Sequence, residues 1–168
     1  MSFFILGMPR SRTTWLSAYF TNCYHEKSME FSTLEQLKEF VTSNKCGISD
    51  TALLLHLDWI QQHISCPIVV IDRKYEEVVS SLVELGFKES VMLQKIREKI
   101  DTCSDVFKVR FEDIDKSLPD ICRYVGEPYN KQRHIELKEM SIQPIKETLL
   151  KRMGENYENI KQLYGAWL

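Results

Sequence analysis

The stretch GMPRSRTTWL, residues 7–16, directly follows the short apolar run Ser2–Leu6 and opens a helix-like segment. An apolar strand, a glycine, a proline that limits the turn, and hydroxyl groups at a helix start together outline a phosphate-binding loop. The lysine that nucleotide-hydrolysing loops of this shape contain is absent, and two arginines flank Ser11 instead. The stretch therefore predicts a strand–loop–helix unit that binds an anion, and the loop pattern alone does not identify that anion.

The composition predicts one globular domain spanning residues 1–168, because 43% of the residues are hydrophobic and this length supports a single core. The net charge is −2, from 22 basic and 24 acidic residues, so the chain has no general attraction for nucleic acid or anionic lipid. No run approaches the ~18 consecutive apolar residues of a membrane span. Any anion site must therefore be local, and we expect neither a nucleic-acid partner nor a membrane span.

Cysteine usage and the amino-terminal segment both favour a cytoplasmic protein. The five cysteines are scattered, odd in number and form no CxxC pair, which is typical of reduced thiols. The apolar run at the amino terminus is about five residues long and has no basic leader, unlike a signal peptide. His25 and Glu26 share the first two residues of the zinc pattern HExxH, but Met29 stands where the second histidine belongs. We therefore expect no metal site.

Short apolar runs alternate with helix-like segments along the chain. The runs of strand length are Phe3–Leu6, Pro67–Ile71, Val106–Val109 and, more weakly, Cys46–Ile48. The helix-like segments are Trp15–Phe20, Leu34–Val41, a segment from Asp50 to Ile64, Tyr75–Leu85, Asp113–Val125 and Gln143–Tyr164. This alternation predicts an α/β three-layer sandwich with a mainly parallel central sheet, similar to the P-loop NTPases.

Folds of this class bind ligands where strands pass into helices, at the carboxyl edge of the sheet. The residues to examine for chemistry are therefore those that follow each expected strand, namely residues 7–14, 49–51, 72–75 and 110–113.

The loop differs from the nucleotide-binding pattern G-x-x-x-x-G-K-[ST] at two positions, since Arg12 replaces the second glycine and Thr13 replaces the lysine. Losing that lysine removes the contact to the β and γ phosphates on which phosphoryl transfer depends. Arg10 brings positive charge earlier in the loop, and Ser11, Thr13 and Thr14 supply hydroxyl donors at the helix start.

The loop resembles that of the sulfotransferase family, G-x-P-[RK]-S-G-T-T-[WL]-L, which holds the 5′-phosphosulfate of PAPS (3′-phosphoadenosine 5′-phosphosulfate). The chain matches this pattern at Gly7, Pro9, Arg10, Ser11, Thr13, Thr14, Trp15 and Leu16. It departs at Arg12, where the family usually has glycine, and an arginine there adds strain if the loop needs a positive φ. The resemblance implies a PAPS site formed by Gly7, Pro9, Arg10, Ser11, Arg12, Thr13 and Thr14.

A second segment strengthens the resemblance. The family's 3′-phosphate site has the form R-x-P-x-x-x-x-x-S, and here Arg73 follows the Pro67–Ile71 run with Ser81 eight residues later. An arginine fork binds phosphate through two hydrogen bonds, and Ser81 donates from the helix that follows. Tyr75 replaces the usual proline, and Ser80 is an alternative donor to Ser81.

The resemblance implies a sulfotransferase that transfers a sulfuryl group from PAPS to a hydroxyl or amine acceptor by in-line displacement, without a metal. Such transfer needs a cation where charge builds on the leaving phosphate and a base that takes the proton of the acceptor. Arg10 is the candidate cation. Glu26 and His25 are the candidate bases, with Asp50 as a third, and the acceptor remains unidentified.

Two other readings stay open. A P-loop nucleotide or nucleoside kinase is suggested by the segment PIVVID, whose Asp72 resembles a magnesium-binding carboxylate after a buried strand, although Thr13 replaces the required lysine. A non-catalytic nucleotide-binding module on the same fold is the third, because Arg12 and Tyr75 depart from the family's pattern.

Overall fold

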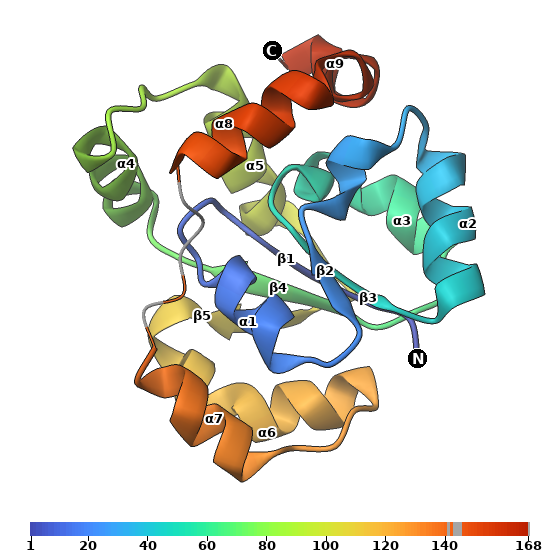
Figure 1. The fold of residues 1–168 in the computed structure, drawn as a ribbon, viewed down its shortest axis with the longest axis vertical. Coiled ribbons are helices and arrows are strands. Elements are labelled where there is room, and N and C mark those ends of the chain that lie inside the picture. Colours follow the sequence, from blue (N-terminus) through green and yellow to red (C-terminus); the bar gives the residue numbers. More distant parts are fainter. Residues whose placement is uncertain (141, 143–145, 168) are drawn as a thin grey trace.

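A computed structural model of the chain describes residues 1–140, 142 and 146–167. Within these residues the sheet has five strands, all parallel, in the order β2-β3-β1-β4-β5 (Figure 1). The strands are β1 (Phe3–Gly7), β2 (Cys23–His25), β3 (Gly47–Asp50), β4 (Ile68–Asp72) and β5 (Phe107–Arg110).

Helices connect the strands and continue beyond them. They are α1 (Thr13–Tyr19), α2 (Leu34–Asn44), α3 (Leu57–His63), α4 (Tyr75–Glu84), α5 (Val91–Thr102), α6 (Ile114–Val125), α7 (Lys131–Lys138), α8 (Lys146–Glu155) and α9 (Tyr157–Tyr164). Short 3-10 turns span Lys27–Glu30, Ala52–His56, Phe111–Asp113 and Gly165–Trp167.

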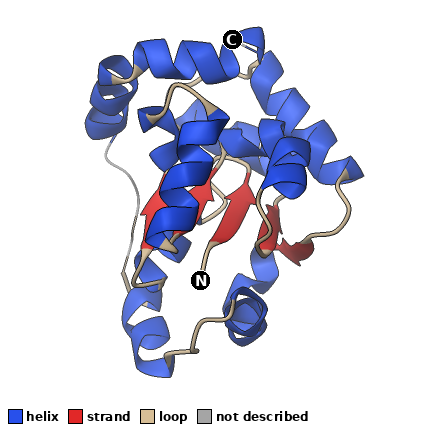
Figure 2. Ribbon diagram, turned by 90° about the vertical axis from the view of Figure 1, so that its right-hand side faces the viewer, coloured by secondary structure: helices blue, strands red, loops and turns tan. Residues whose placement is uncertain are grey.

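The sheet is the middle of three layers because successive side chains of a strand point to opposite faces. Phe4 and Leu6 of β1 pack with α2, α3 and α5, whereas Phe3 and Ile5 pack with α1, α6 and α7. Figure 2 shows the strands enclosed between helices, and in Figure 1 α6 and α7 lie at the bottom and α8 and α9 at the top. The predicted α/β sandwich with a parallel central sheet is confirmed.

Several elements differ from the expectation. Strand β2 was not predicted, because three residues at a sheet edge are too few to show an alternating pattern. Asp50 ends β3 instead of beginning one long helix; its Oδ1 accepts the Leu53 N–H at 3.1 Å and caps a 3-10 turn before α3. The expected helix Gln143–Tyr164 is two helices, α8 and α9, and residues 143–145 lie outside the described residues.

None of the helices in the described ranges combines the length and the apolar character needed to cross a membrane.

Candidate functional site

A cavity of about 590 Å³ lies at the carboxyl edge of the sheet, between the segments that follow β1 to β4 and the helices α8 and α9. Ten of the residues predicted from the sequence line it, namely Pro9, Arg10, Arg12, Thr13, Thr14, His25, Glu26, Asp50, Arg73 and Ser81. Gly7 ends β1 and Ser11 is fully buried in the loop. The parallel sheet thus brings together segments that are up to 70 or so residues apart in the chain, as all four strands end at one edge.

The loop after β1 has an unusual backbone. Arg10 and Arg12 both adopt left-handed conformations, with φ of 66° and 61°, which side chains other than glycine adopt at a steric cost. Gly7 suits the start of the loop for a different reason: a Cβ added there would make tight contacts, 3.1 Å from Ile71 Cβ and 3.3 Å from the Ile71 carbonyl oxygen. Glycine therefore permits the loop to begin close against β4.

The side chain of Arg12 is directed to α6. Its guanidinium donates two hydrogen bonds to Asp115, at 3.0 and 3.3 Å, and lies 4.1 Å from the ring centre of Trp15. Asp115 also bonds His134 Nε2 at 3.0 Å. These contacts hold Arg12 in the left-handed conformation that would favour glycine.

Arg10 connects the loop to the second predicted segment. Its Nε donates to Ser81 Oγ at 3.1 Å, and Arg73 Nη1 donates to the Arg10 carbonyl oxygen. The Arg73 guanidinium lies 4.1 Å from the ring centre of Phe111, a favourable cation–π arrangement. Ser81 lines the cavity whereas Ser80 is exposed and does not, so the geometry selects Ser81 over its neighbour.

Two buried polar atoms of this region lack hydrogen-bond partners. Among the described residues, Ser11 Oγ and Arg73 Nε are the buried side-chain nitrogen or oxygen atoms without one. Arg73 Nε lies 3.5 Å from Glu77 Oε2, close enough for an ion pair but outside hydrogen-bonding geometry. An unsatisfied buried donor costs about 1–3 kcal/mol, so two of them in the neighbouring segments that follow β1 and β4 suit a site completed by an anion.

The three candidate bases lie together on another part of the cavity wall. His25 Nε2 is 3.1 Å from Thr14 Oγ1 and 3.9 Å from Glu26 Oε1. Glu26 Oε1 accepts a hydrogen bond from Thr51 Oγ1 at 3.3 Å. Asp50 is fully buried and accepts the Ser28 hydroxyl at 2.7 Å.

Burial sets the protonation of this cluster. It lowers the pKa of His25 to about 4, because the imidazolium loses hydration, so the ring is neutral at neutral pH. Burial raises the pKa of Glu26 for the same reason, because here the deprotonated form carries the charge that loses hydration. It also raises the pKa of Asp50, and the neighbouring Glu26 charge adds to that shift. A raised pKa makes the Glu26 carboxylate a better proton acceptor, whereas the lowered pKa of His25 makes its ring a weaker one.

The wall of the cavity opposite the loop has no distinctive pattern in the sequence. It is formed mainly by apolar side chains, among them Met29, Phe87, Met92, Leu149, Met153 and Ile160. Their spacing is indistinguishable from that of ordinary core positions. Arg152 of α8 also reaches the candidate bases, since its Nη2 donates to the carbonyl oxygens of His25 and Glu26 at 3.5 and 3.3 Å.

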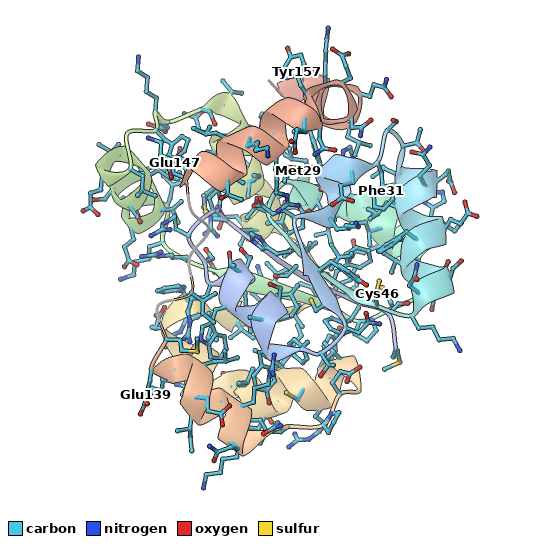
Figure 3. All side chains as sticks on the ribbon, viewed as in Figure 1. Met29, Phe31, Cys46, Glu139, Glu147 and Tyr157 are labelled. Atoms are coloured by element: carbon cyan, nitrogen blue, oxygen red, sulfur yellow. The ribbon has the colours of Figure 1, made fainter. Side chains whose placement is uncertain are left out.

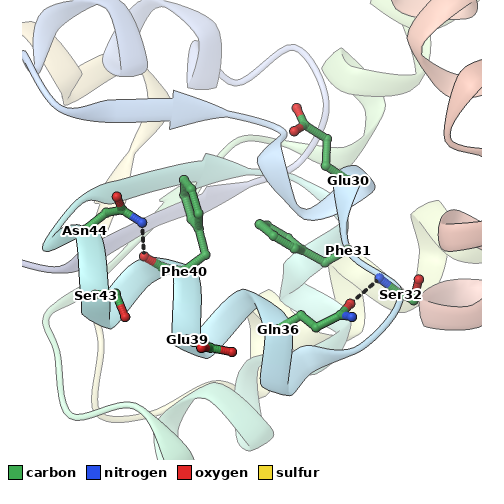
Figure 4. A pocket seen from close by; sticks show the side chains of 8 residues that line it. All are labelled: Glu30, Phe31, Ser32, Gln36, Glu39, Phe40, Ser43 and Asn44. Carbon is green, nitrogen blue, oxygen red and sulfur yellow. Dashed lines mark hydrogen bonds between the residues drawn. The ribbon is translucent and has the colours of Figure 1, made fainter.

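A separate groove of about 500 Å³ runs along α2, between residues such as Phe31, Gln36 and Phe40 (Figure 4). None of the strand-end residues predicted from the sequence lines it. Within the described residues, no group of three or more His, Cys, Asp or Glu side chains is placed to hold a metal ion.

Comparison with known proteins extends the description of the fold. No protein-family model and no curated protein matches the sequence. The structure is similar to that of mouse sulfotransferase SULT7A1 complexed with PAP, with a TM-score of 0.55 and 16% identity over 87% of this chain and 67% of that chain. It also aligns with a sulfotransferase from Alicyclobacillus acidocaldarius, with a TM-score of 0.49 and 11% identity over 98% of this chain and 94% of that chain. The chain therefore has the fold of the sulfotransferases.

Proposed function

We propose that the protein is a sulfotransferase that transfers a sulfuryl group from PAPS to a hydroxyl or amine acceptor. The observation that carries the proposal is the link Ser81–Arg10–Arg73, which joins the two phosphate-binding segments on one cavity wall beside the candidate bases. The complex of the mouse neighbour with PAP is in keeping with this proposal.

The residues present fit the donor. The unpartnered Ser11 Oγ, with Thr13 and Thr14, would bind the 5′-phosphosulfate, and Arg73 and Ser81 would bind the 3′-phosphate. Pro9 shapes the turn of the loop, and Gly7 allows it to start close to β4. Arg12 contributes by holding the loop through Asp115.

When bound, PAPS would supply the sulfuryl group, and transfer would exchange the bond from sulfur to the bridging phosphate oxygen for a bond to the acceptor atom. Arg10 stabilises the negative charge that develops on the leaving phosphate. Glu26, or His25 beside it, accepts the proton of the acceptor hydroxyl. Side chains that line the same cavity perform both tasks, and neither task requires a metal ion.

The kinase alternative is less well supported. Asp72, the candidate magnesium ligand, is already hydrogen-bonded to Arg97 Nη1 at 2.7 Å, and Thr13 stands where the phosphate-binding lysine is needed. The other alternative is a non-catalytic nucleotide-binding module, and an assay of PAPS turnover distinguishes it from a sulfotransferase.

Calorimetric titration with adenosine 3′,5′-bisphosphate and with ATP·Mg²⁺ tests the donor assignment. We expect the bisphosphate to bind without metal and at least about tenfold more tightly than ATP·Mg²⁺, a difference of about 1.4 kcal/mol. Tighter binding of ATP·Mg²⁺ would contradict the proposal. Bisphosphate binding without turnover of PAPS on any acceptor would identify a non-catalytic module.

A further inference from the structure

We infer that Arg97 of α5 is a positioning residue, which sets the affinity of the site for a 3′-phosphate by acting through Arg73. This inference rests on the proposed function, in which Arg73 binds that phosphate. Arg97 does not line the cavity, so it acts without touching the nucleotide. Its contacts with the end of β4 are the reason for assigning it this role.

The guanidinium of Arg97 joins α5 to the end of β4. Its Nη1 donates to Asp72 Oδ1 at 2.7 Å and to the Arg73 carbonyl oxygen at 3.1 Å. Its Nε donates to Asp101 Oδ2 at 3.1 Å, and its Nη2 donates to Asp101 Oδ1. The Arg97 side chain is only 18% exposed, and hydrogen bonds to charged groups are the stronger ones. The planar guanidinium is therefore held in one orientation.

Helix α5 gives Arg97 a fixed place relative to the sheet. Arg97 and Asp101 are four residues apart and so lie on the same face of the helix. Ile96 and Ile100 of α5 are buried in the same cluster as Val70 of β4. Side chains fill the space between α5 and the sheet (Figure 3). The apolar packing anchors the helix, and Arg97 extends that anchoring to the strand end.

The contact with the Arg73 carbonyl oxygen affects how the Arg73 side chain is presented. Arg73 directly follows β4, and its peptide is held by Arg97 while the preceding Asp72 is held by the same group. The Arg73 guanidinium in turn donates to the Arg10 carbonyl oxygen and lies 4.1 Å from the ring centre of Phe111. A long side chain loses conformational entropy when it binds a ligand, and a fixed backbone lowers that cost.

The charges around the two arginines assign them different tasks. Asp72 and Asp101 both accept hydrogen bonds from Arg97 and balance its positive charge. Arg73 Nε lies 3.5 Å from a carboxylate oxygen of Glu77, a side chain that is 47% exposed and therefore screened by water. Arg97 thus supplies orientation, whereas the charge of Arg73 stays available to an anion.

Calorimetric titration of Arg97→Met with adenosine 3′,5′-bisphosphate and with adenosine 5′-monophosphate tests the inference. We expect the substitution to lower the preference for the bisphosphate by about tenfold and to change the affinity for the monophosphate by less than about threefold. An equal loss of affinity for both nucleotides would overturn the inference, because a general disturbance of the fold weakens both.

Two further variants of α5 are matched to this one. Arg97→Lys keeps the charge, but an ammonium group cannot bridge the carboxylate and the carbonyl oxygen as a planar fork does, so the preference should fall by about threefold or more. Lys99→Met removes an ion pair with Asp58 on the same helix and should leave the preference within about twofold. The full wild-type preference in Arg97→Lys, or a loss in Lys99→Met as large as in Arg97→Met, would overturn the inference.

A double-mutant cycle with Arg73→Ala tests whether Arg97 acts through Arg73. In the Arg73→Ala background, Arg97→Met should change the bisphosphate affinity by less than about twofold, because the side chain through which it acts is gone. A loss as large as in the wild-type background would overturn the inference and show that Arg97 supports the fold in general.

The wild-type protein separates this inference from the proposed function. A wild type that binds the bisphosphate no more tightly than the monophosphate would overturn the 3′-phosphate site of the proposed function, and the role of Arg97 with it. A wild type that prefers the bisphosphate, with an Arg97→Met variant that keeps the same preference, would overturn the role of Arg97 alone.

Discussion

Arg12 combines a backbone conformation that favours glycine with a side chain that makes specific contacts. A non-glycine residue in the left-handed region costs about 1–2 kcal/mol, and the Asp115 and Trp15 contacts partly offset that cost. Arg12→Gly removes both the cost and the contacts, whereas Arg12→Ala keeps the cost and loses the contacts. We expect the glycine variant to be more stable than the alanine variant by about 1 kcal/mol or more in urea unfolding. Equal stabilities would show that the conformation is not strained.

Arg73 is expected to distinguish nucleotides by their 3′-phosphate. Arg73→Ala should weaken adenosine 3′,5′-bisphosphate by about 10–100-fold and adenosine 5′-monophosphate much less, because a charged double hydrogen bond is lost only with the former. Lys74→Ala is the control, since Lys74 is adjacent and does not line the cavity. Calorimetry that finds the same loss for both nucleotides would remove the 3′-phosphate role from Arg73.

Glu26 is the base that we favour. Glu26→Gln should lower kcat by about 10²–10⁴-fold while bisphosphate affinity stays unchanged, because the amide keeps the shape and cannot accept the proton. A base acts when deprotonated, so activity should fall as pH drops through the raised pKa of Glu26. A pH–rate profile of Glu26→Gln that retains the same acidic limb, with full kcat, would move the role to His25.

At the scale of elements, hydrogen bonds to the turns after β2 and β3 help to hold α9 over the cavity. Tyr164 is 1% exposed and its hydroxyl bonds Ser28, while His56 Nε2 bonds the Leu163 carbonyl oxygen at 2.9 Å. Tyr164→Phe should lower the free energy of unfolding by about 1 kcal/mol and speed amide exchange in α9 more than in α6. If the substitution speeds amide exchange equally in α9 and α6, the Tyr164–Ser28 hydrogen bond does not specifically hold α9 over the cavity.

Sequence patterns predicted the strands and helices whose own residues form a clear apolar run or stripe. The strand Phe3–Leu6 and the helix Tyr75–Leu85 were found because each shows a clear apolar run or stripe. Strand β2 was missed because pairing with β3 alone defines its three residues. The break between α8 and α9 was missed because both halves continue one helical apolar pattern.

The same distinction between local and long-range information applies to the residues of the candidate site. The position of Ser11 and Arg73 at the sheet edge was predictable because parallel strands end at one edge, while their roles in binding stay predictions. The destination of the Arg12 side chain was not predictable, since Asp115 lies 103 residues away. The apolar wall opposite the loop was not predictable either, because Met29 and Leu149 meet only through the packing of the C-terminal helices.

For the whole molecule, His25 should make stability depend on pH. Its folded pKa, about 4, is lower than its unfolded value of about 6.5, so protons bind the unfolded chain first as pH falls. Its contribution is present above pH 6.5 and is lost as pH falls towards 4, by roughly 2–3 kcal/mol. Glu26 and Asp50, whose folded pKa values are raised, act in the opposite direction by destabilising the fold as pH rises.

Urea unfolding of the wild type and of His25→Gln between pH 7 and pH 4 isolates this contribution. The difference in free energy of unfolding between the two proteins should shift in favour of the variant as pH falls. A difference that is constant with pH would show that His25 titrates normally in the folded protein.

The most direct test of the account is transfer of the labelled sulfuryl group from radiolabelled PAPS to a panel of phenol, alcohol, amine, sugar and peptide acceptors, in the presence of EDTA. We predict labelled product from at least one acceptor with the wild-type protein and at least about a hundredfold less from Glu26→Gln. A protein that binds adenosine 3′,5′-bisphosphate and yet yields no labelled product from phenol, alcohol, amine, sugar or peptide acceptors would contradict the assignment as a sulfotransferase.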